Sequence, residues 1–336
     1  MTRRCTAQLR KLNNNLVRDT MLARDAWTKE TLAAATGLSQ STCHNILMAM
    51  LKSGEVAELP LAAPDGGRPA RRFRYCREHV LFALVLLQCE KHQKSISVII
   101  ADTGGEILQQ EKRFAETVTP DLLFRMTAAA IKDYPSVKAI GISYPGVVLN
   151  GKTSCWSDME ELSGIDLAAK LRMHFSLPFV IENDVNLATW GYAGKHEKET
   201  SCLAYIAFPP GGSLPGCGLV LDGRLFRGYR GFAGEVLYIQ NQSWQEQRKK
   251  MNSPHGAAEM VLQMLRPVTA LLDPERIVVA GGNIQQSDIR YIQEKCGSMV
   301  RSDFLPRLFF QPDYSPDNFS GLLDLVRKKL HSELTG

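Results

Sequence analysis

The sequence predicts a small α+β module followed by a two-lobed α/β protein. Two features support this fold class: a pair of short helical segments joined at Gly37 and, from about residue 80, two successive halves that each run from strands into helices. We expect the module over residues 1–79, a first lobe over residues 80–197 and a second lobe over residues 198–336, whose last helix is a candidate to return to the first lobe.

Residues 28–53 carry the pattern of a helix-turn-helix. Apolar side chains recur at helical spacing on either side of Thr36-Gly37, where Gly37 can supply the positive φ of a tight turn, and Ser39 stands at the N-cap of the second helix. That helix shows polar side chains able to reach base edges or phosphates, namely Gln40, Ser41, Thr42, His44 and Asn45. A helix at about Leu12–Leu22 is expected to brace the pair, and the alternative is an αα-hairpin that only packs.

A basic hairpin follows these helices. Residues 55–59 have strand character, residues 64–67 form a turn signal, and Arg71–Tyr75 alternates basic and aromatic residues like a second strand. Gly67-Arg68-Pro69 at the tip can place an arginine in a narrow minor groove. The pattern predicts an α+β winged helix-turn-helix domain with Arg68, Arg71 and Arg72 as further DNA-binding residues, and the alternative is an ordinary basic surface hairpin.

The charge distribution separates this module from the rest of the chain. Residues 1–79 hold 13 Lys and Arg against 7 Asp and Glu, whereas the remainder holds 27 against 28. A basic module on a near-neutral body indicates phosphate contacts at one end, so we expect a double-stranded DNA operator as partner.

Cysteine usage and hydropathy favour a cytoplasmic protein without a membrane partner. The eight cysteines are scattered singly, with no closely spaced pair, which is typical of reduced thiols. No apolar run approaches the ~20 residues needed to span a bilayer. The first residues lack the apolar core of a signal peptide.

The elements of the two lobes follow in order. In the first half we predict strands at Leu81–Gln88, Ser95–Ala101, Glu106–Phe114, Val137–Ser143 and Phe179–Glu182, with helices at Asp121–Asp133 and Asp166–Phe175. Residues 102–105 form the turn between the second and third strands. In the second half we predict strands at Cys202–Phe208, Gly218–Leu221, Arg224–Arg227 and Arg276–Ala280, with a helix-rich region before the last. Two such halves suggest a cleft between lobes.

Three motifs inside these lobes appear in a recognisable order. They are residues 142–148 (ISYPGVV), residues 181–186 (IENDVN) and residues 231–235 (GFAGE), with Ala280-Gly281-Gly282 behind them. The chain resembles the ROK family of sugar kinases and sugar-responsive repressors, and its N-terminal module ending in Gly-Arg-Pro-Ala resembles the repressor branch. The resemblance implies an actin-like ATPase (ROK-type) fold with a carbohydrate site between the lobes.

The resemblance also implies ligand-binding residues. Gly146, Asn183, Asp184, Glu235 and Tyr238 are the expected set, since they are convergent polar groups suited to a polyol. The alternative is structural: Asn183-Asp184 caps a helix, and Glu235 pairs with a nearby arginine.

The phosphate loops favour a protein that is no longer a kinase. Asp184 matches the family's general base, but the turn that should resemble Asp-x-Gly-Gly-Thr reads Cys89–Lys94 and contains no glycine. Leu214 stands where the second phosphate loop should have a glycine, and Gly281-Gly282 can serve as a mere strand-to-helix connection. We therefore expect no catalytic residue and no cofactor. The alternatives are a carbohydrate kinase with an N-terminal extension and a regulator whose cleft is empty.

The family's zinc segment is missing as well. ROK proteins often have a histidine after the Ala-Gly-Glu motif and then a cysteine-rich segment, whereas here Tyr238 takes that place and residues 240–250 contain no cysteine. We expect no metal site, with His255 an ordinary surface or core residue and Tyr238 able to stack on a pyranose. A transcriptional repressor acting as a homodimer or a dimer of dimers is the function that these patterns favour.

Overall fold

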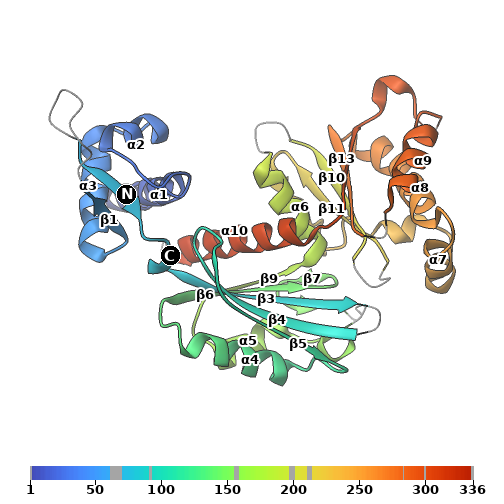
Figure 1. The fold of residues 1–336 in the computed structure, drawn as a ribbon, viewed down its shortest axis with the longest axis horizontal. Helices are drawn as coiled ribbons and strands as arrows, with labels where there is room; N and C mark the ends of the chain where they lie inside the picture. Colours follow the sequence, from blue (N-terminus) through green and yellow to red (C-terminus); the bar gives the residue numbers. More distant parts are fainter. Residues whose placement is uncertain are drawn as a thin grey trace.

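The computed structural model describes residues 2–60, 70–90, 93–154, 159–196, 201–209, 214–282, 284–298 and 300–333. Three parts follow one another along the long axis of the molecule: the N-terminal module, the first lobe and the second lobe (Figure 1). The longest connection between them is α10, which runs back from the second lobe along the first lobe (Figure 1). Across the described ranges, no helix combines the length and apolar character needed to cross a membrane.

The helices and strands have the following bounds. The α-helices are α1 (Thr2–Met21), α2 (Lys29–Thr36), α3 (Gln40–Ser53), α4 (Pro120–Lys132), α5 (Leu167–His174), α6 (Asp184–Lys195), α7 (Trp244–Met251), α8 (Gly256–Leu272), α9 (Gln286–Cys296) and α10 (Ser315–Glu333). The strands are β1 (Val56–Leu59), β2 (Arg72–Tyr75), β3 (Leu81–Glu90), β4 (Gln93–Asp102), β5 (Ile107–Ala115), β6 (Val137–Tyr144), β7 (Val148–Leu149), β8 (Lys152–Thr153), β9 (Phe179–Asn183), β10 (Leu203–Ala207), β11 (Gly216–Leu221), β12 (Arg224–Leu225), β13 (Arg276–Ala280) and β14 (Arg307–Gln311).

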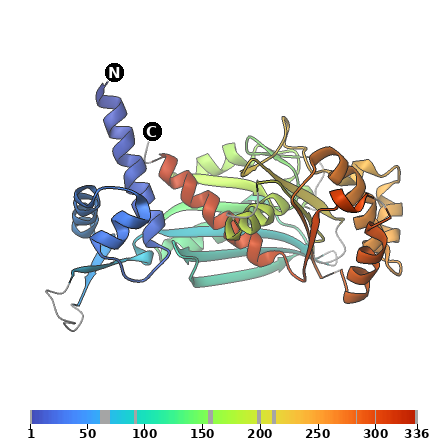
Figure 2. The same ribbon diagram turned by 90° about the horizontal axis from the view of Figure 1, so that it is seen from above.

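In the N-terminal module, the two helices lie where the sequence predicts them. Gly37 ends α2 with a φ of 70°, and the Ser39 hydroxyl accepts a hydrogen bond from the Thr42 amide at the start of α3. The prediction for α1 is wrong at its beginning, because that helix starts at Thr2 rather than near residue 12. The early turns of α1 extend away from the module (Figure 2). The sequence prediction did not assign them to the helix.

The expected hairpin is present as an antiparallel pair of β1 and β2, with Val56 opposite Tyr75. Trp27 forms an isolated β-bridge with Phe73, because its amide donates to the Phe73 carbonyl at 2.9 Å and its carbonyl accepts from the Phe73 amide at 2.8 Å. Trp27 and Phe73 are buried with the apolar faces of α2 and α3 in a core of their own. The predicted turn at residues 64–67 and Arg68 lie outside the described residues.

Each lobe is built on a five-stranded sheet, and the strand order is the same in both. The first sheet runs β5-β4-β3-β6-β9 and the second runs β12-β11-β10-β13-β14. In each sheet, the first three strands along the chain form an antiparallel meander. The fourth strand pairs in parallel with the first, and the fifth pairs in parallel with the fourth. The two halves therefore repeat one supersecondary pattern, as the alternation of strands and helices in the sequence suggests.

Two helices lie between these sheets. Apolar residues of α6 pack against β10, β11 and β13, whereas those of α10 pack against β3, β4 and β6 of the first sheet. The chain thus returns from the second lobe to the first through α10 (Figure 1). The opposite face of the first sheet is covered by α4 and α5.

The helices α6 and α10 cross at two glycines. A Cβ atom on Gly191 of α6 would lie 1.9 Å from the Asp317 carbonyl oxygen, and one on Gly321 of α10 would lie 1.9 Å from the Leu187 carbonyl oxygen. Such distances are far below van der Waals contact, so the two backbones can approach only because both positions lack a side chain.

We predict that Gly191→Ala destabilises the protein by about 3 kcal/mol, because the added methyl group must separate the two helices. The measurement is the free energy of unfolding from urea titrations. Gly194→Ala is the matched control, since Gly194 lies in the same helix with no atom within 4 Å of the added Cβ. It should leave stability unchanged or raise it by up to about 1 kcal/mol, because alanine favours helices. Equal effects of the two substitutions would contradict this description of the crossing.

Candidate functional site

A cavity of about 370 Å³ lies between the two lobes. Its walls come from the end of β3, the loop after β6, the start of α6, residues between β10 and the start of β11, the segment from Phe232 into α7, and Tyr314. All five residues predicted to bind a ligand line it: Gly146, Asn183, Asp184, Glu235 and Tyr238. The structure therefore brings the expected set together from both halves of the chain, and a role in binding stays a prediction.

Asp184 is the buried acid of this cavity. One carboxylate oxygen accepts from the Val185 amide at 2.9 Å, and the other accepts from the Tyr314 hydroxyl at 3.3 Å. The pKa of Asp184 is raised to about 7, mainly by burial and also by the nearby Glu235 carboxylate, while the hydrogen bonds from Val185 and Tyr314 oppose the shift. A carboxyl group with a pKa near neutrality can both accept and donate hydrogen bonds at physiological pH.

Asn183 is committed to the protein itself. Its carbonyl oxygen accepts from the Asn186 amide at 2.9 Å and caps α6. Its amide nitrogen donates to the Gly146 carbonyl at 3.1 Å and to the Asp184 carboxylate at 3.2 Å. Both donors are therefore used, so Asn183 fixes Gly146 and Asp184 and has little capacity left for a ligand. The structural alternative considered for Asn183 is thus correct about the cap.

Glu235 reaches the cavity from a tight turn. Gly234 has a φ of 92°, and a Cβ atom there would lie 1.7 Å from the Cys217 carbonyl, so the turn presses against β11 and directs the next residue inward. Burial raises the pKa of Glu235. The alternative for Glu235 was an ion pair with a nearby arginine. Such an ion pair exists in this region, but Glu182 forms it, with its carboxylate 2.6 Å from Arg227 Nε.

Aromatic rings form one wall of the cavity. The ring centroids of Phe232 and Tyr238 are 5.1 Å apart, and those of Tyr238 and Trp244 are 5.4 Å apart at an interplanar angle of 85°. Rings of this kind pack against the apolar face of a pyranose while the buried carboxyls bind its hydroxyls. The sequence prediction found Tyr238 but missed Phe232, Trp244 and Tyr314; Trp244 begins a short helix capped by Ser243, and that capping signal was available.

The strands β3 and β4 pair along their whole described length. The antiparallel pairing continues to Glu90 opposite Gln93, so only two residues connect the strands. Backbone amides that pair across strands cannot cradle a phosphate, and Gln88 and Cys89 line the cavity instead. The turn at residues 102–105, which carries two glycines, joins β4 to β5 at the opposite end of the sheet, where Leu81 pairs with Asp102.

The other two glycine-rich segments also differ from phosphate sites. Leu214 lines the cavity and packs against the core of the second lobe, so a bulky side chain occupies the position of the family's glycine. Gly281 has a φ of 129°, and a Cβ atom there would lie 2.2 Å from the Phe208 carbonyl. Close packing at the end of β13 is therefore a sufficient reason for a glycine at this position, and no bound nucleotide is needed to explain it.

No group of three or more His, Cys, Asp and Glu side chains converges as a metal site within the described part of the chain. His255 has a local role instead: its Nδ1 lies 2.9 Å from the Asp288 carboxylate, and its ring stacks on Tyr291 at 4.9 Å between centroids. The absence of bound metal stays a prediction.

The second candidate surface lies on α3. Gln40, Ser41, His44 and Asn45 are exposed, as residues that contact a base edge must be. Thr42 is only partly exposed and its hydroxyl lies 2.8 Å from that of Ser39, so it supports the turn rather than projecting outward. A groove of about 490 Å³ between α1 and α3 places Arg10 and Asn13 beside Thr42 and Asn45. The sequence prediction missed these two residues of α1.

The hairpin arginines differ from one another. Arg71 forms a two-point ion pair with Glu58 of the neighbouring strand, and its guanidinium lies over the Phe73 ring. Arg71 therefore stabilises the hairpin in the free protein, although an exposed pair of this kind is weak enough to exchange for a phosphate. Arg72 is partly exposed and Arg74 is exposed, and the prediction did not include Arg74.

Comparison with known proteins places these features in a family. Residues 93–248 match the ROK family. The xylose repressor of Bacillus subtilis (strain 168) is 24% identical over 244 residues, covering 69% of this chain and 61% of the repressor, so the chain spans less than two thirds of that relative. A glucokinase of Streptomyces coelicolor is 27% identical over 153 residues, covering 43% of this chain and 46% of the enzyme. A solved ROK family transcriptional regulator, a homologue of the E. coli MLC protein, has a TM-score of 0.71 at 17% identity and covers 98% of both chains, which shows the fold.

The buried acid predicts a specific pH dependence of stability. Because the pKa of Asp184 is about 7 in the folded protein against 3.8 for a free group, the folded state retains a proton that the unfolded state has lost. Stability should therefore fall as pH rises from about 4 to 7, by up to about 4 kcal/mol from this group. Asp184→Asn, which is neutral at every pH, should flatten that fall in urea titrations.

Asp303→Asn is the control for this prediction, since the Asp303 carboxylate is exposed. It should leave the pH profile of the free energy of unfolding as it is in the unmodified chain. A profile that Asp184→Asn does not flatten would mean that Asp184 is ionised in the folded state throughout this range.

Proposed function

This chain belongs to the ROK family, and we propose that it is a DNA-binding transcriptional repressor that senses a sugar or sugar derivative in the cavity between its lobes. The observation that carries the proposal is the presence in one chain of an exposed polar helix beside a basic hairpin and of a cavity with two buried carboxyl groups and an aromatic wall. The first combination suits a DNA major groove, and the second suits a polyol.

The relatives suggest which sugar to test first. The Bacillus subtilis relative is named a xylose repressor, so D-xylose is the first candidate effector. The ring wall of Phe232, Tyr238 and Trp244 supplies stacking area, while Asp184 and Glu235 supply polar groups for hydroxyls. The cavity volume of about 370 Å³ is at the lower end of the range for small-molecule sites and suits a monosaccharide better than a longer sugar.

We further propose that the chain has no kinase activity and needs no cofactor or metal. The short turn between β3 and β4 and the side chain of Leu214 support this, because phosphoryl transfer depends on positioning and charge neutralisation of the phosphates. A carbohydrate kinase is the second candidate. Asp184 favours it, since a pKa near 7 suits a general base, and a glucokinase is among the relatives.

A cytoplasmic homodimer or dimer of dimers is the assembly that we propose. One helix-turn-helix offers few base contacts, and two-fold symmetry doubles them across a palindromic operator. The lobes are the expected interface, because the N-terminal module is small and basic.

We predict that His44→Ala or Asn45→Ala lowers the preference for the operator over random duplex about tenfold, since both side chains are exposed on α3. Arg72→Ala should instead weaken binding to all duplexes and reduce the slope of log K against log salt by about one. Fluorescence anisotropy with duplexes from the region upstream of the gene measures both.

Arg71→Ala is the comparison variant and should have a smaller effect, because Glu58 already holds that arginine. The proposal fails if the unmodified chain prefers none of these duplexes at low salt.

We predict that D-xylose or a related monosaccharide binds the purified chain with heat that ATP and magnesium do not change, and that a coupled assay detects no phosphorylation. Calorimetry across a sugar panel, with and without ATP, separates the three possibilities of sensor, kinase and empty cleft. Glu235→Ala should abolish sugar binding, because it removes one of the two carboxyl groups of the cavity. Turnover that Asp184→Asn abolishes would establish the kinase instead.

A further inference from the structure

We propose that α10 couples the cavity to the N-terminal module: Tyr314 and Asn318 position Asp184 at one end of the helix, and Arg327 holds the junction with the module at the other. The consequence for DNA binding rests on the proposed function, whereas the mechanical coupling does not. A continuous series of contacts runs from the cavity to the module along this helix.

The first end of α10 contacts the buried acid directly. The Tyr314 hydroxyl donates to the Asp184 carboxylate at 3.3 Å. The Asn318 amide donates to the Asp184 main-chain carbonyl at 2.8 Å and to the Ser143 hydroxyl at 3.0 Å. Tyr314 also lines the cavity, so a ligand that contacts Asp184 acts on the residue immediately before α10. Tyr314 and Asn318 are therefore positioning residues for Asp184 and do not replace its carboxylate.

The middle of α10 is held rigidly against α6. Besides the crossing at Gly191 and Gly321, the Trp190 indole donates to the Asp324 carboxylate at 2.6 Å, and Lys195 pairs with Asp317 at 2.6 Å. A Cβ atom on Gly141 of β6 would lie 2.5 Å from a methyl group of Val326, so the helix is pressed onto the first sheet as well. A helix packed this closely moves as one body rather than bending.

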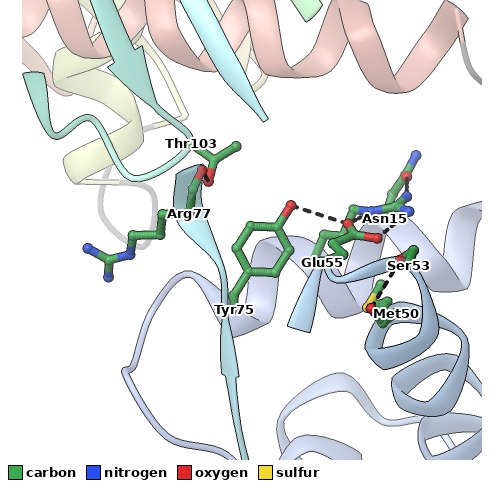
Figure 3. Close-up of polar contacts among 8 residues, drawn as sticks. Asn15, Met50, Ser53, Glu55, Tyr75, Arg77 and Thr103 are labelled. Atoms are coloured by element: carbon green, nitrogen blue, oxygen red, sulfur yellow. Dashed lines mark hydrogen bonds and ion pairs between the residues drawn. The ribbon is translucent and has the colours of Figure 1, made fainter. Parts of the chain in front are cut away.

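The second end of α10 contacts the turn between β4 and β5. Arg327 donates to the Thr103 carbonyl at 2.7 Å. In turn, the Thr103 amide and hydroxyl both donate to the Arg77 carbonyl, at 3.3 Å and 3.1 Å. Figure 3 shows Thr103 and Arg77 side by side above Tyr75 at this junction. The Arg77 side chain then reaches the module, with one nitrogen 3.4 Å from the Leu22 carbonyl and 3.5 Å from the Asp25 carboxylate.

A buried polar cluster stiffens the part of the N-terminal module that lies next to Arg77. Glu55, at the end of the α3–β1 turn, accepts from the Tyr75 hydroxyl at 3.2 Å and from Arg18 of α1 at 3.1 Å (Figure 3). This cluster ties α1, the segment before β1 and β2 to one another just beyond Arg77. Burial lowers the pKa of His331 in the last turn of α10, and the Asp19 carboxylate of α1 opposes this shift, so the end of α10 faces α1. The module is thus attached through Arg77 and α1, not through a flexible linker.

Coupling follows from the position of α10 between the lobes. The helix begins at the second lobe and packs on the first, so closure of the lobes around a ligand must shift its first turn, together with Asp184 and α6, relative to the first sheet. A rigid helix turns that shift into a tilt at Arg327, which lies ~20 Å further along its axis. A ligand can change the module in this way only if it binds the two arrangements with different affinity.

The test uses amide hydrogen exchange of the full chain and requires neither a sugar nor DNA. Tyr314→Phe removes the hydroxyl that contacts Asp184, and we expect exchange at residues 77–79 and 103–105 to become about threefold faster. In the Arg327→Met background, Tyr314→Phe should add nothing at these amides. Effects of substitutions ~20 Å apart normally add, so the loss of additivity identifies the helix as the connection.

Two comparison variants keep the test specific. Lys328→Met removes a neighbouring cation that lies over the Trp190 ring on α6 and near Asp324, and the effect of Tyr314→Phe should persist in that background. Arg327→Lys retains a donor for the Thr103 carbonyl and should restore part of the response. Thermal unfolding of each variant confirms that it folds. No change at the junction in Tyr314→Phe, or additive changes in the double variant, would overturn the proposal.

A second measurement separates this inference from the proposed function. If the chain binds an operator and D-xylose weakens that binding, Arg327→Met should reduce the response at least fivefold while leaving D-xylose affinity unchanged by calorimetry. An unchanged response in Arg327→Met would reject α10 as the route. If instead the unmodified chain binds no operator, the repressor function fails while the exchange experiment still decides whether α10 couples the two parts.

Discussion

The contact of α6 with α10 at Gly191 and Gly321 is the constraint on which the arrangement of the two lobes depends. Each glycine faces a main-chain carbonyl of the other helix, so the crossing distance is set by backbone against backbone. Because α6 packs on the second sheet and α10 on the first, this distance also sets how far apart the sheets lie. The volume of the cavity, whose floor is the first turn of α6, follows from the same contact.

The same buried carboxyl group of the cavity would suit a sugar-binding site or a catalytic site. Burial and the neighbouring Glu235 hold the pKa of Asp184 near neutrality, which suits a general base and equally suits a group that exchanges hydrogen bonds with a hydroxyl. What distinguishes the two roles lies elsewhere, in the backbone that would face a phosphate. In this chain the strands β3 and β4 continue their pairing up to Glu90 and Gln93, next to the residues that line the cavity.

Local signals in the sequence were sufficient for much of the fold. Gly37 and Ser39 marked a helix turn that the structure reproduces, and β13 was bounded correctly because buried β-branched residues run directly into two glycines. The start of α1 was missed, since the prediction placed it at about Leu12 whereas the helix begins at Thr2. The cavity was only half predicted: the motif residues were identified from a resemblance, whereas Tyr314 enters from more than 120 residues away along the chain, and no local pattern reports such a contact. For Asn183 the prediction of a place in the cavity was right, but its hydrogen bonds are made to other protein groups and not to the cavity.

Three of the four tryptophans lie within the described residues and occupy mechanically distinct places, so their fluorescence can report on separate events. Trp27 is buried in the N-terminal module, Trp190 donates to Asp324 where α6 meets α10, and Trp244 lines the cavity wall. The indole emission of each would respond to a different event: unfolding of the module, separation of the two helices, or occupation of the cavity. Variants that retain one of these three indoles, with Trp156 replaced in each, would therefore show in parallel titrations the order in which those events occur.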